Sequence, residues 1–150
     1  IKLVAPPTAL PDAKTLKAMV DKKLLAFNQQ VSTYIPDSEI SLFNRREVGE
    51  WQSVSPELFE TIALSQKIGL LSSGAFDITV GPLVDLWGFG AKSTTDCRGI
   101  AGENMTKCLP TNEDMAVALA LVGDEKLELD GDSSRIRKSA PISIDLSAVA

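Results

Sequence analysis

Apolar residues recur along the first part of the chain with the period of an α-helix. Pro11 stands where such a helix can begin, and polar residues such as Lys17 and Asp21 occupy the opposite face. The apolar positions of this stripe are Leu16, Met19, Val20, Leu24, Phe27 and Val31. We therefore predict an amphipathic helix from about Pro11 to Val31, with its apolar stripe packed into the core.

Capping residues predict a second long helix. Ser55 is a favourable N-cap, and Pro56 suits the first helical position. The helix is expected to run to about Leu71. Gly74 follows as the residue that can adopt the left-handed conformation beyond a helix end.

Two shorter helices are expected in other parts of the chain. SEISLFN, after a turn at Pro36-Asp37, reads as a short helical segment. Thr111, with Asp114 three residues later, resembles a capping box for the helix MAVALALV, which Gly123 ends.

Extended segments alternate with these helices. IKLVA at residues 1–5 predicts a strand, AFDITV contains a short extended piece, and KLELD and RIRK form a hairpin around Gly131. Alternation at Ile142, Ile144 and Leu146 predicts a last strand, which places Asp145 on its polar face. Because helices and strands are mixed without a regular βαβ period, the predicted fold class is α+β.

Composition narrows the chemistry. The chain has 150 residues, 44% of them hydrophobic and 23% charged, as expected for one globular domain. A net charge of -5 argues against nucleic acid as a partner. Histidine is absent, which excludes Ser-His-Asp and Cys-His catalysis and histidine-ligated zinc within this chain. A metal ion bound here would be a hard cation held by oxygen atoms, such as magnesium or calcium.

The two cysteines, Cys97 and Cys108, bracket a polar stretch, CRGIAGENMTKC, inside an insertion-like loop at 91–110. Their spacing does not fit a redox Cys-x-x-Cys motif or a zinc knuckle. We favour a disulfide that closes this loop, which would fit an oxidising compartment. The alternative is two free thiols in a cytosolic protein.

Three stretches place small or polar groups beside an aromatic or apolar residue, as ligand sites often do. They are STYIPDSE at 32–39, SGAFDITVGP at 73–82 and DLSA at 145–148. Each has a structural alternative. Tyr34 could be a half-buried core aromatic, Gly74 only a helix stop and Asp77 only a turn or capping acid. Asp145 could be one of several acids on an exposed strand face.

Taken together, the blocks STYIPDSEISLFN, SGAFDITVGPLVDLWGFG and DLSAVA resemble the ApbE family of flavin transferases in order and separation. VSPELFE and the ALALVG helix followed by KLELD also match. The resemblance covers nearly the whole chain and is weakest at 91–110. It implies the ApbE fold of mixed helices and a largely antiparallel sheet, of which residues 1–150 are the N-terminal part of one domain.

The resemblance also implies an activity. Family members bind FAD and, with Mg²⁺, transfer its FMN moiety to a Thr or Ser hydroxyl of a target protein. Their acceptors include subunits of sodium-pumping NADH:quinone oxidoreductase and related redox complexes. They are exported to the periplasm, commonly as lipoproteins anchored to the inner membrane, and we expect the same location here.

Site residues follow from the matched motifs. The expected FAD contacts are Tyr34, Ala75, Phe76, Asp77 and Asp145. Ala148 would supply a backbone carbonyl to the metal. The family pattern continues beyond Ala150 with further metal ligands, so we expect the 150-residue chain alone to be inactive. A second chain carrying the rest of the domain is a candidate partner.

Two other functions remain open at this point. Some family members instead hydrolyse FAD to FMN and AMP, which makes a magnesium-dependent FAD pyrophosphatase the first alternative. The second is a noncatalytic flavin-binding scaffold domain that uses the same fold to present a surface.

Overall fold

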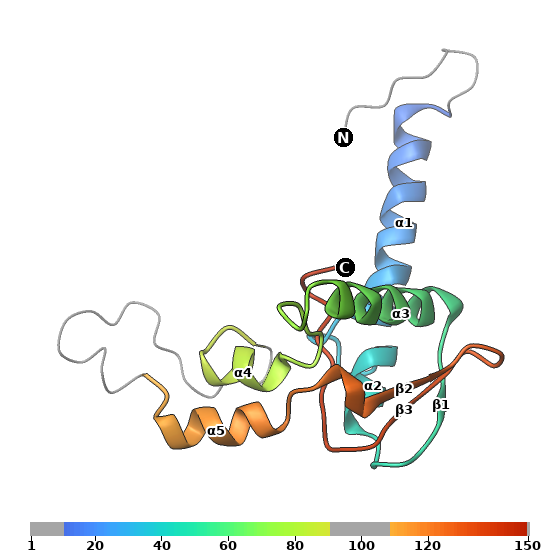
Figure 1. Cartoon of the computed structure of the whole chain (residues 1–150). Coiled ribbons are helices and arrows are strands. Elements are labelled where there is room, and N and C mark those ends of the chain that lie inside the picture. The colour runs from blue at the N-terminus through green and yellow to red at the C-terminus, as the bar shows by residue number, and fades with distance from the viewer. Residues whose placement is uncertain (1–10, 91–108, 150) are drawn as a thin grey trace.

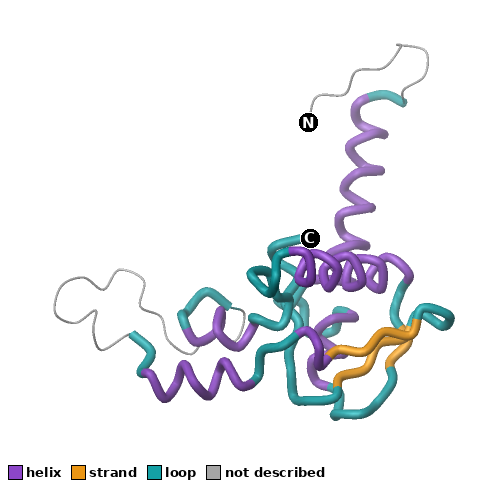
Figure 2. Tube along the Cα trace, viewed as in Figure 1, coloured by secondary structure: helices purple, strands orange, loops and turns teal. Residues whose placement is uncertain are grey.

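The computed structural model describes residues 11–90 and 109–149 (Figures 1 and 2). The elements are α1 (Ala13–Val31), α2 (Glu39–Arg45), β1 (Gln52–Ser53), α3 (Pro56–Leu71), α4 (Gly81–Leu86), α5 (Asn112–Ala120), η2 (Asp124–Lys126), β2 (Leu127–Asp130) and β3 (Arg135–Lys138). Three strands pair in the order β1-β3-β2. Helices α2 and α3 lie beside this small antiparallel sheet, and α4 and α5 lie together to one side of it (Figures 1 and 2). This mixture confirms the predicted α+β class.

The predicted helix signals act as expected. Ser55 caps α3, its hydroxyl accepting from the Leu58 N–H at 3.4 Å, and Pro56 is the first helical residue. Beyond the end of α3, Gly74 has a φ of 81°, the left-handed value that favours glycine. The capping box at α5 is complete, with reciprocal bonds between Thr111 and Asp114. At α1 the cap is Asp12, one residue later than the predicted start at Pro11.

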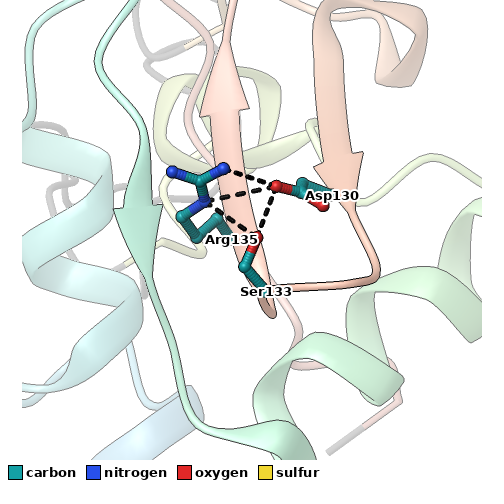
Figure 3. A network of polar contacts seen from close by, with 3 residues as sticks. All are labelled: Asp130, Ser133 and Arg135. Atoms are coloured by element: carbon teal, nitrogen blue, oxygen red, sulfur yellow. Dashed lines mark hydrogen bonds and ion pairs between the residues drawn. The ribbon is translucent and has the colours of Figure 1, made fainter.

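The KLELD–RIRK hairpin is confirmed as β2 paired antiparallel with β3, with Asp130 opposite Arg135. At its closed end, the Asp130 carboxylate accepts from the Ser133 hydroxyl at 2.6 Å and from the Arg135 guanidinium at 2.6 Å (Figure 3). These bonds lower the pKa of Asp130 below its ordinary value, and the bond from the Ser133 hydroxyl has the largest effect. The turn is thus held by an anchored carboxylate.

The core lies where α2, α3, the sheet and the segment 142–146 meet. Its fully buried members come from all four, and they include Phe43, Leu58, Ile62, Ile136 and Ile144. Burying several large apolar side chains contributes about 1.5–3 kcal/mol each, so this cluster is the main source of stability in the described part.

The prediction that the apolar stripe of α1 lies in the core is wrong over most of its length. Met19 and Leu24 are each 56% exposed, and only Val31 is buried. Figure 1 shows the reason: α1 extends away from the body, and only its last turns reach α2 and the core. The spacing of apolar residues correctly predicted a helix with an apolar face, but no described part of the chain packs against most of that face.

Two predicted extended segments are not strands. Residues 142–146 keep the expected alternation, with Ile142, Ile144 and Leu146 buried, but they do not join the sheet. Their backbone groups are paired elsewhere: the Asp145 N–H donates to the carbonyl of Ile78 at 2.7 Å. Residues 75–80 form turns instead of an extended piece.

The predicted strand at 1–5 and the Cys97–Cys108 loop lie outside the described residues, so both remain predictions. No described helix combines the length and the apolar character needed to cross a membrane.

Candidate functional site

A cavity of about 330 Å³ gathers the predicted site residues from three separate parts of the chain. All six of them contribute to its wall. The lining residues are Tyr34, Ala75, Phe76, Asp77, Ile78, Val80, Val84, Phe89, Asp145, Ser147 and Ala148. The structure therefore brings together the three blocks that the sequence singled out.

The 73–80 segment enters this cavity because α3 ends in a hydrogen-bonded turn. The Gly74 N–H donates to the carbonyl of Gly69 at 2.9 Å. The Ser72 hydroxyl donates to the same carbonyl at 3.0 Å and accepts from the Phe76 N–H at 3.1 Å. This turn reverses the chain and places Ala75 and Phe76 on the cavity wall.

Asp77 is held by three hydrogen bonds. Its Oδ1 accepts from the Thr79 N–H at 2.7 Å and from the Thr79 hydroxyl at 2.6 Å. Its Oδ2 accepts from the Asp124 N–H at 3.3 Å. Asp77 therefore lines the cavity and also connects the turns at 75–80 to the segment that follows α5 through hydrogen bonds.

Asp145 is held by a similar but purely local arrangement. Its Oδ1 accepts from the Ser147 N–H at 2.8 Å and from the Ser147 hydroxyl at 2.5 Å. Its backbone is fixed from two sides, because its own N–H reaches Ile78 and the side chain of Asn44 binds its neighbour Ile144. The carboxylate is only half-buried, so it can face a ligand in the cavity.

Two exposed aromatic rings stand at the cavity. Tyr34 is 66% exposed, which rules out the alternative that it is a half-buried core aromatic. Its hydroxyl donates to the carbonyl of Phe89 at 3.4 Å, and Phe89 itself is 75% exposed. Large exposed aromatic faces are unfavourable in water and suit a planar ligand that stacks on them.

A second cavity of about 270 Å³ shares Tyr34 and Asp145 with the first. Sequence interpretation missed its polar side chains, among them Asn44 and Arg45, and it also missed Phe89 in the first cavity. Asn44 and Phe89 lie inside the matched blocks SEISLFN and LWGFG, and Arg45 directly follows the first of these. The blocks themselves were therefore the available signal, although nothing in them indicated which members face a cavity.

The acidic groups near the site influence one another. Burial, then the negative charges of Asp77 and Glu125, raise the pKa of Asp124 above its ordinary value. Asp124 thus ionises less readily than an exposed carboxyl group. A ligand or a cation that adds positive charge here would relieve this repulsion.

The oxygen atoms at the cavity match only part of a magnesium site. Asp77, Asp145 and Ala148 are among the residues that line the cavity, and Mg²⁺ prefers carboxylate and carbonyl oxygen donors. Within 11–90 and 109–149, however, no three His, Cys, Asp or Glu side chains are grouped so that they could hold a metal ion. The described residues therefore offer oxygen donors but do not complete such a site.

Comparison with known proteins decides the family. The family model described as "ApbE family" matches residues 1–150. The chain belongs to the ApbE family. This result confirms the resemblance that the three sequence blocks suggested.

The relatives of this ApbE chain are flavin transferases. It is 35% identical over 151 residues to the FAD:protein FMN transferase of Vibrio cholerae, covering 100% of this chain and 41% of the relative. The FAD:protein FMN transferase of Haemophilus influenzae is 33% identical over 127 residues, which cover 82% of this chain and 34% of the relative.

Solved structures give the same result. The flavin transferase ApbE of Vibrio cholerae superposes with a TM-score of 0.80 at 34% identity, over 95% of this chain and 42% of that one. The apo form of the flavinyl transferase ApbE of Pseudomonas stutzeri superposes with a TM-score of 0.79 at 31% identity, over 93% of this chain and 42% of that one. The chain thus spans about two fifths of the length of these proteins.

Proposed function

We propose that the cavity around Tyr34, Asp77 and Asp145 binds FAD, and that the protein to which this chain contributes transfers FMN from FAD to a hydroxyl of an acceptor protein. The observation that carries the proposal is the meeting of all six expected residues in one cavity. The relatives in Vibrio cholerae and Haemophilus influenzae are named FAD:protein FMN transferases, which supports the reaction.

The groups at the cavity suit the parts of such a ligand. The exposed rings of Tyr34 and Phe89 offer faces for a flat ring system. The carboxylates of Asp77 and Asp145 can accept from sugar hydroxyls or an amino group, which are charge-assisted hydrogen bonds. Ala75 and Phe76, at the end of a tight turn, allow close approach to the backbone.

In the proposed reaction, the oxygen of an acceptor Thr or Ser hydroxyl attacks the FMN phosphorus of the pyrophosphate. A new phosphoester bond forms, the P–O bond to the AMP phosphate breaks, and AMP leaves with the negative charge. The hydroxyl proton is released to solvent or to a base. Positioning and charge stabilisation dominate such transfers, and this chain's own contribution is to orient the dinucleotide.

The remaining parts of the proposal rest on family resemblance. Mg²⁺ would neutralise charge on the phosphates, with the Ala148 carbonyl as one of its oxygen ligands. The proposed acceptors are subunits of sodium-pumping NADH:quinone oxidoreductase and related redox complexes. The proposed location is the periplasm, with the protein anchored to the inner membrane as a lipoprotein.

FAD affinity of the full-length protein tests the binding site directly. We expect Asp145→Asn to weaken FAD binding by about ten- to a hundredfold, because a lost charge-assisted hydrogen bond costs about 1.5–3 kcal/mol. Asp132→Asn, in the exposed hairpin turn, is the matched control and should bind FAD as the parent protein does. Equal affinities for all three proteins in fluorescence quenching would contradict the site assignment.

Product analysis separates the three functional hypotheses. Full-length protein is incubated with FAD, Mg²⁺ and a Thr-containing acceptor peptide. Flavin-labelled peptide and AMP support the transferase, whereas free FMN and AMP without labelling indicate a pyrophosphatase. FAD binding with neither product indicates a noncatalytic flavin-binding scaffold.

A further inference from the structure

One polar side chain beside the cavity is completely buried and is not among the expected ligand contacts. Thr79 is 0% exposed and does not line the cavity, yet its hydroxyl forms two hydrogen bonds. It donates to Asp77 Oδ1 at 2.6 Å and accepts from the Gly123 N–H at 2.7 Å. A buried hydroxyl with both a donor and an acceptor role filled has one fixed orientation.

This hydroxyl joins two distant segments at the site. The Thr79–Gly123 bond spans 44 positions in sequence, and a second bond of similar reach, from the Asp124 N–H to Asp77 Oδ2, lies next to it. The loop after α5 is therefore fastened to the Asp77 turn at two adjacent points. The Asp77 side chain is restrained by this arrangement instead of rotating in solvent.

The arrangement also decides which carboxylate oxygen can receive a ligand. An ionised carboxylate has about four lone-pair positions, two on each oxygen. Thr79 fills both positions on Asp77 Oδ1, whereas the described residues place only the 3.3 Å contact from Asp124 on Oδ2. A donor group of the ligand would therefore meet Oδ2, in an orientation set by Thr79.

We infer that Thr79 is a positioning residue: without touching the ligand, its hydroxyl orients Asp77 for binding the FAD nucleotide. Ser147 provides an internal comparison, because it makes the same two bonds to Asp145 but is exposed and, within 11–90 and 109–149, adds no bond to a distant segment. Loss of the Thr79 hydroxyl should therefore affect the site more than loss of the Ser147 hydroxyl. This inference rests on the proposed FAD site.

The test is FAD affinity of full-length variants. Thr79→Val keeps the shape and removes the hydroxyl, and we expect roughly five- to twentyfold weaker binding, typical of one lost or misplaced hydrogen bond. Thr79→Ser keeps the hydroxyl and should bind FAD within about twofold of the parent protein. Ser147→Ala should lie between these two variants. If the valine variant does not fold, Thr79→Ala takes its place in the same comparison.

Stability alone cannot distinguish positioning from folding, because the valine also leaves the Gly123 N–H unpaired. A double-mutant cycle with Asp77→Ala, which removes the carboxylate that Thr79 binds, does distinguish them. If Thr79 acts through Asp77, Thr79→Val should have little further effect on affinity once Asp77 is changed. An undiminished effect in that background, or equal loss in the serine and valine variants, would overturn the inference.

The outcomes also separate this inference from the proposed function. Parent-like FAD binding by Thr79→Val, with weakened binding by Asp145→Asn, would refute the positioning role and leave the FAD site intact. Parent-like binding by both the Asp77→Asn and Asp145→Asn variants would refute the FAD site itself, and the positioning role with it.

Discussion

The side chain of Asn44 fastens α2 to the segment that carries Asp145, which makes it the sharpest test of how the site is built. Its Nδ2 donates to the carbonyl of Ile144 at 2.8 Å, and its Oδ1 accepts from the N–H of the same residue at 2.8 Å. These two bonds replace the strand ladder that the sequence pattern suggested for 142–146. Ile144 is itself 0% exposed, so water cannot easily take over either bond.

Asn44→Leu removes both bonds at nearly constant size. Each buried backbone group left without a partner costs about 1–3 kcal/mol, and two are lost, so we expect the unfolding free energy to fall by about 2–6 kcal/mol. Asn44→Asp keeps the acceptor for the Ile144 N–H but turns an oxygen toward the Ile144 carbonyl. It should therefore lose about 1–3 kcal/mol.

Urea unfolding followed by circular dichroism measures both losses. Asn28→Leu, on the exposed surface of α1, is the matched control and should stay within about 0.5 kcal/mol of the parent protein. FAD affinity should also fall in Asn44→Leu, since Asp145 follows the clamped residue. An Asn44→Leu protein as stable as the control variant would show that the 142–146 segment does not depend on this clamp.

Three further predictions concern the surroundings of the site. Gly69→Ala should lose about 1–3 kcal/mol in urea unfolding, because the added Cβ would lie 2.7 Å from the Asp124 carboxylate and 3.0 Å from the Phe76 carbonyl. Burial, and then the charge of Asp77, raise the folded-state pKa of Asp124 above its ordinary value of 3.8, so ionisation of this carboxyl group opposes folding at higher pH. Asp124→Asn should therefore raise the urea midpoint at pH 7, and this gain should shrink as the pH falls toward 3.8. Thr111→Ala should cost about 1 kcal/mol through loss of the α5 cap, and parent-like unfolding would contradict the capping role.

Local signals in the sequence were sufficient for most helices and for the hairpin. A cap such as Ser55 or Thr111 acts within three residues, so the interaction it predicts does not depend on the rest of the fold. The same holds for the hairpin, whose two strands are joined by a short turn around Gly131. These elements could be predicted because the causes of their structure are adjacent in sequence.

Elements whose partners are distant could not be predicted in this way. β1 has only two residues and exists because Gln52 and Ser53 pair with β3 far along the chain. Conversely, the alternating pattern at 142–146 gave the correct buried side chains but the wrong backbone partners, because Asn44 lies 100 positions away. The period of α1 likewise identified an apolar face without showing whether anything covers it.

The same distinction applies to the candidate site. The family resemblance of the matched blocks identified six of the eleven residues that line the cavity, because a motif preserves residue identities even where the geometry is unknown. They did not reveal that Thr79 and Asn44 hold Asp77 and Asp145 in place. Thr79 is itself fixed by its bond to Gly123, 44 positions away, and Asn44 acts through its bonds to Ile144, 100 positions away; no local pattern encodes these two long-range contacts.

The two cavity carboxylates should therefore respond differently to the same change. At Asp145, both local bonds fall on Oδ1, and an Asn oxygen in that position can accept them, so Asp145→Asn should weaken FAD binding with little loss of apo stability. At Asp77, the Asn amide nitrogen would face the Asp124 N–H, placing two donors opposite each other. We expect Asp77→Asn to lower both FAD affinity and the apo melting temperature. If instead Asp145→Asn lost as much apo stability as Asp77→Asn, the distinction would be wrong between Asp145, bonded only to a near neighbour, and Asp77, bonded to a distant segment.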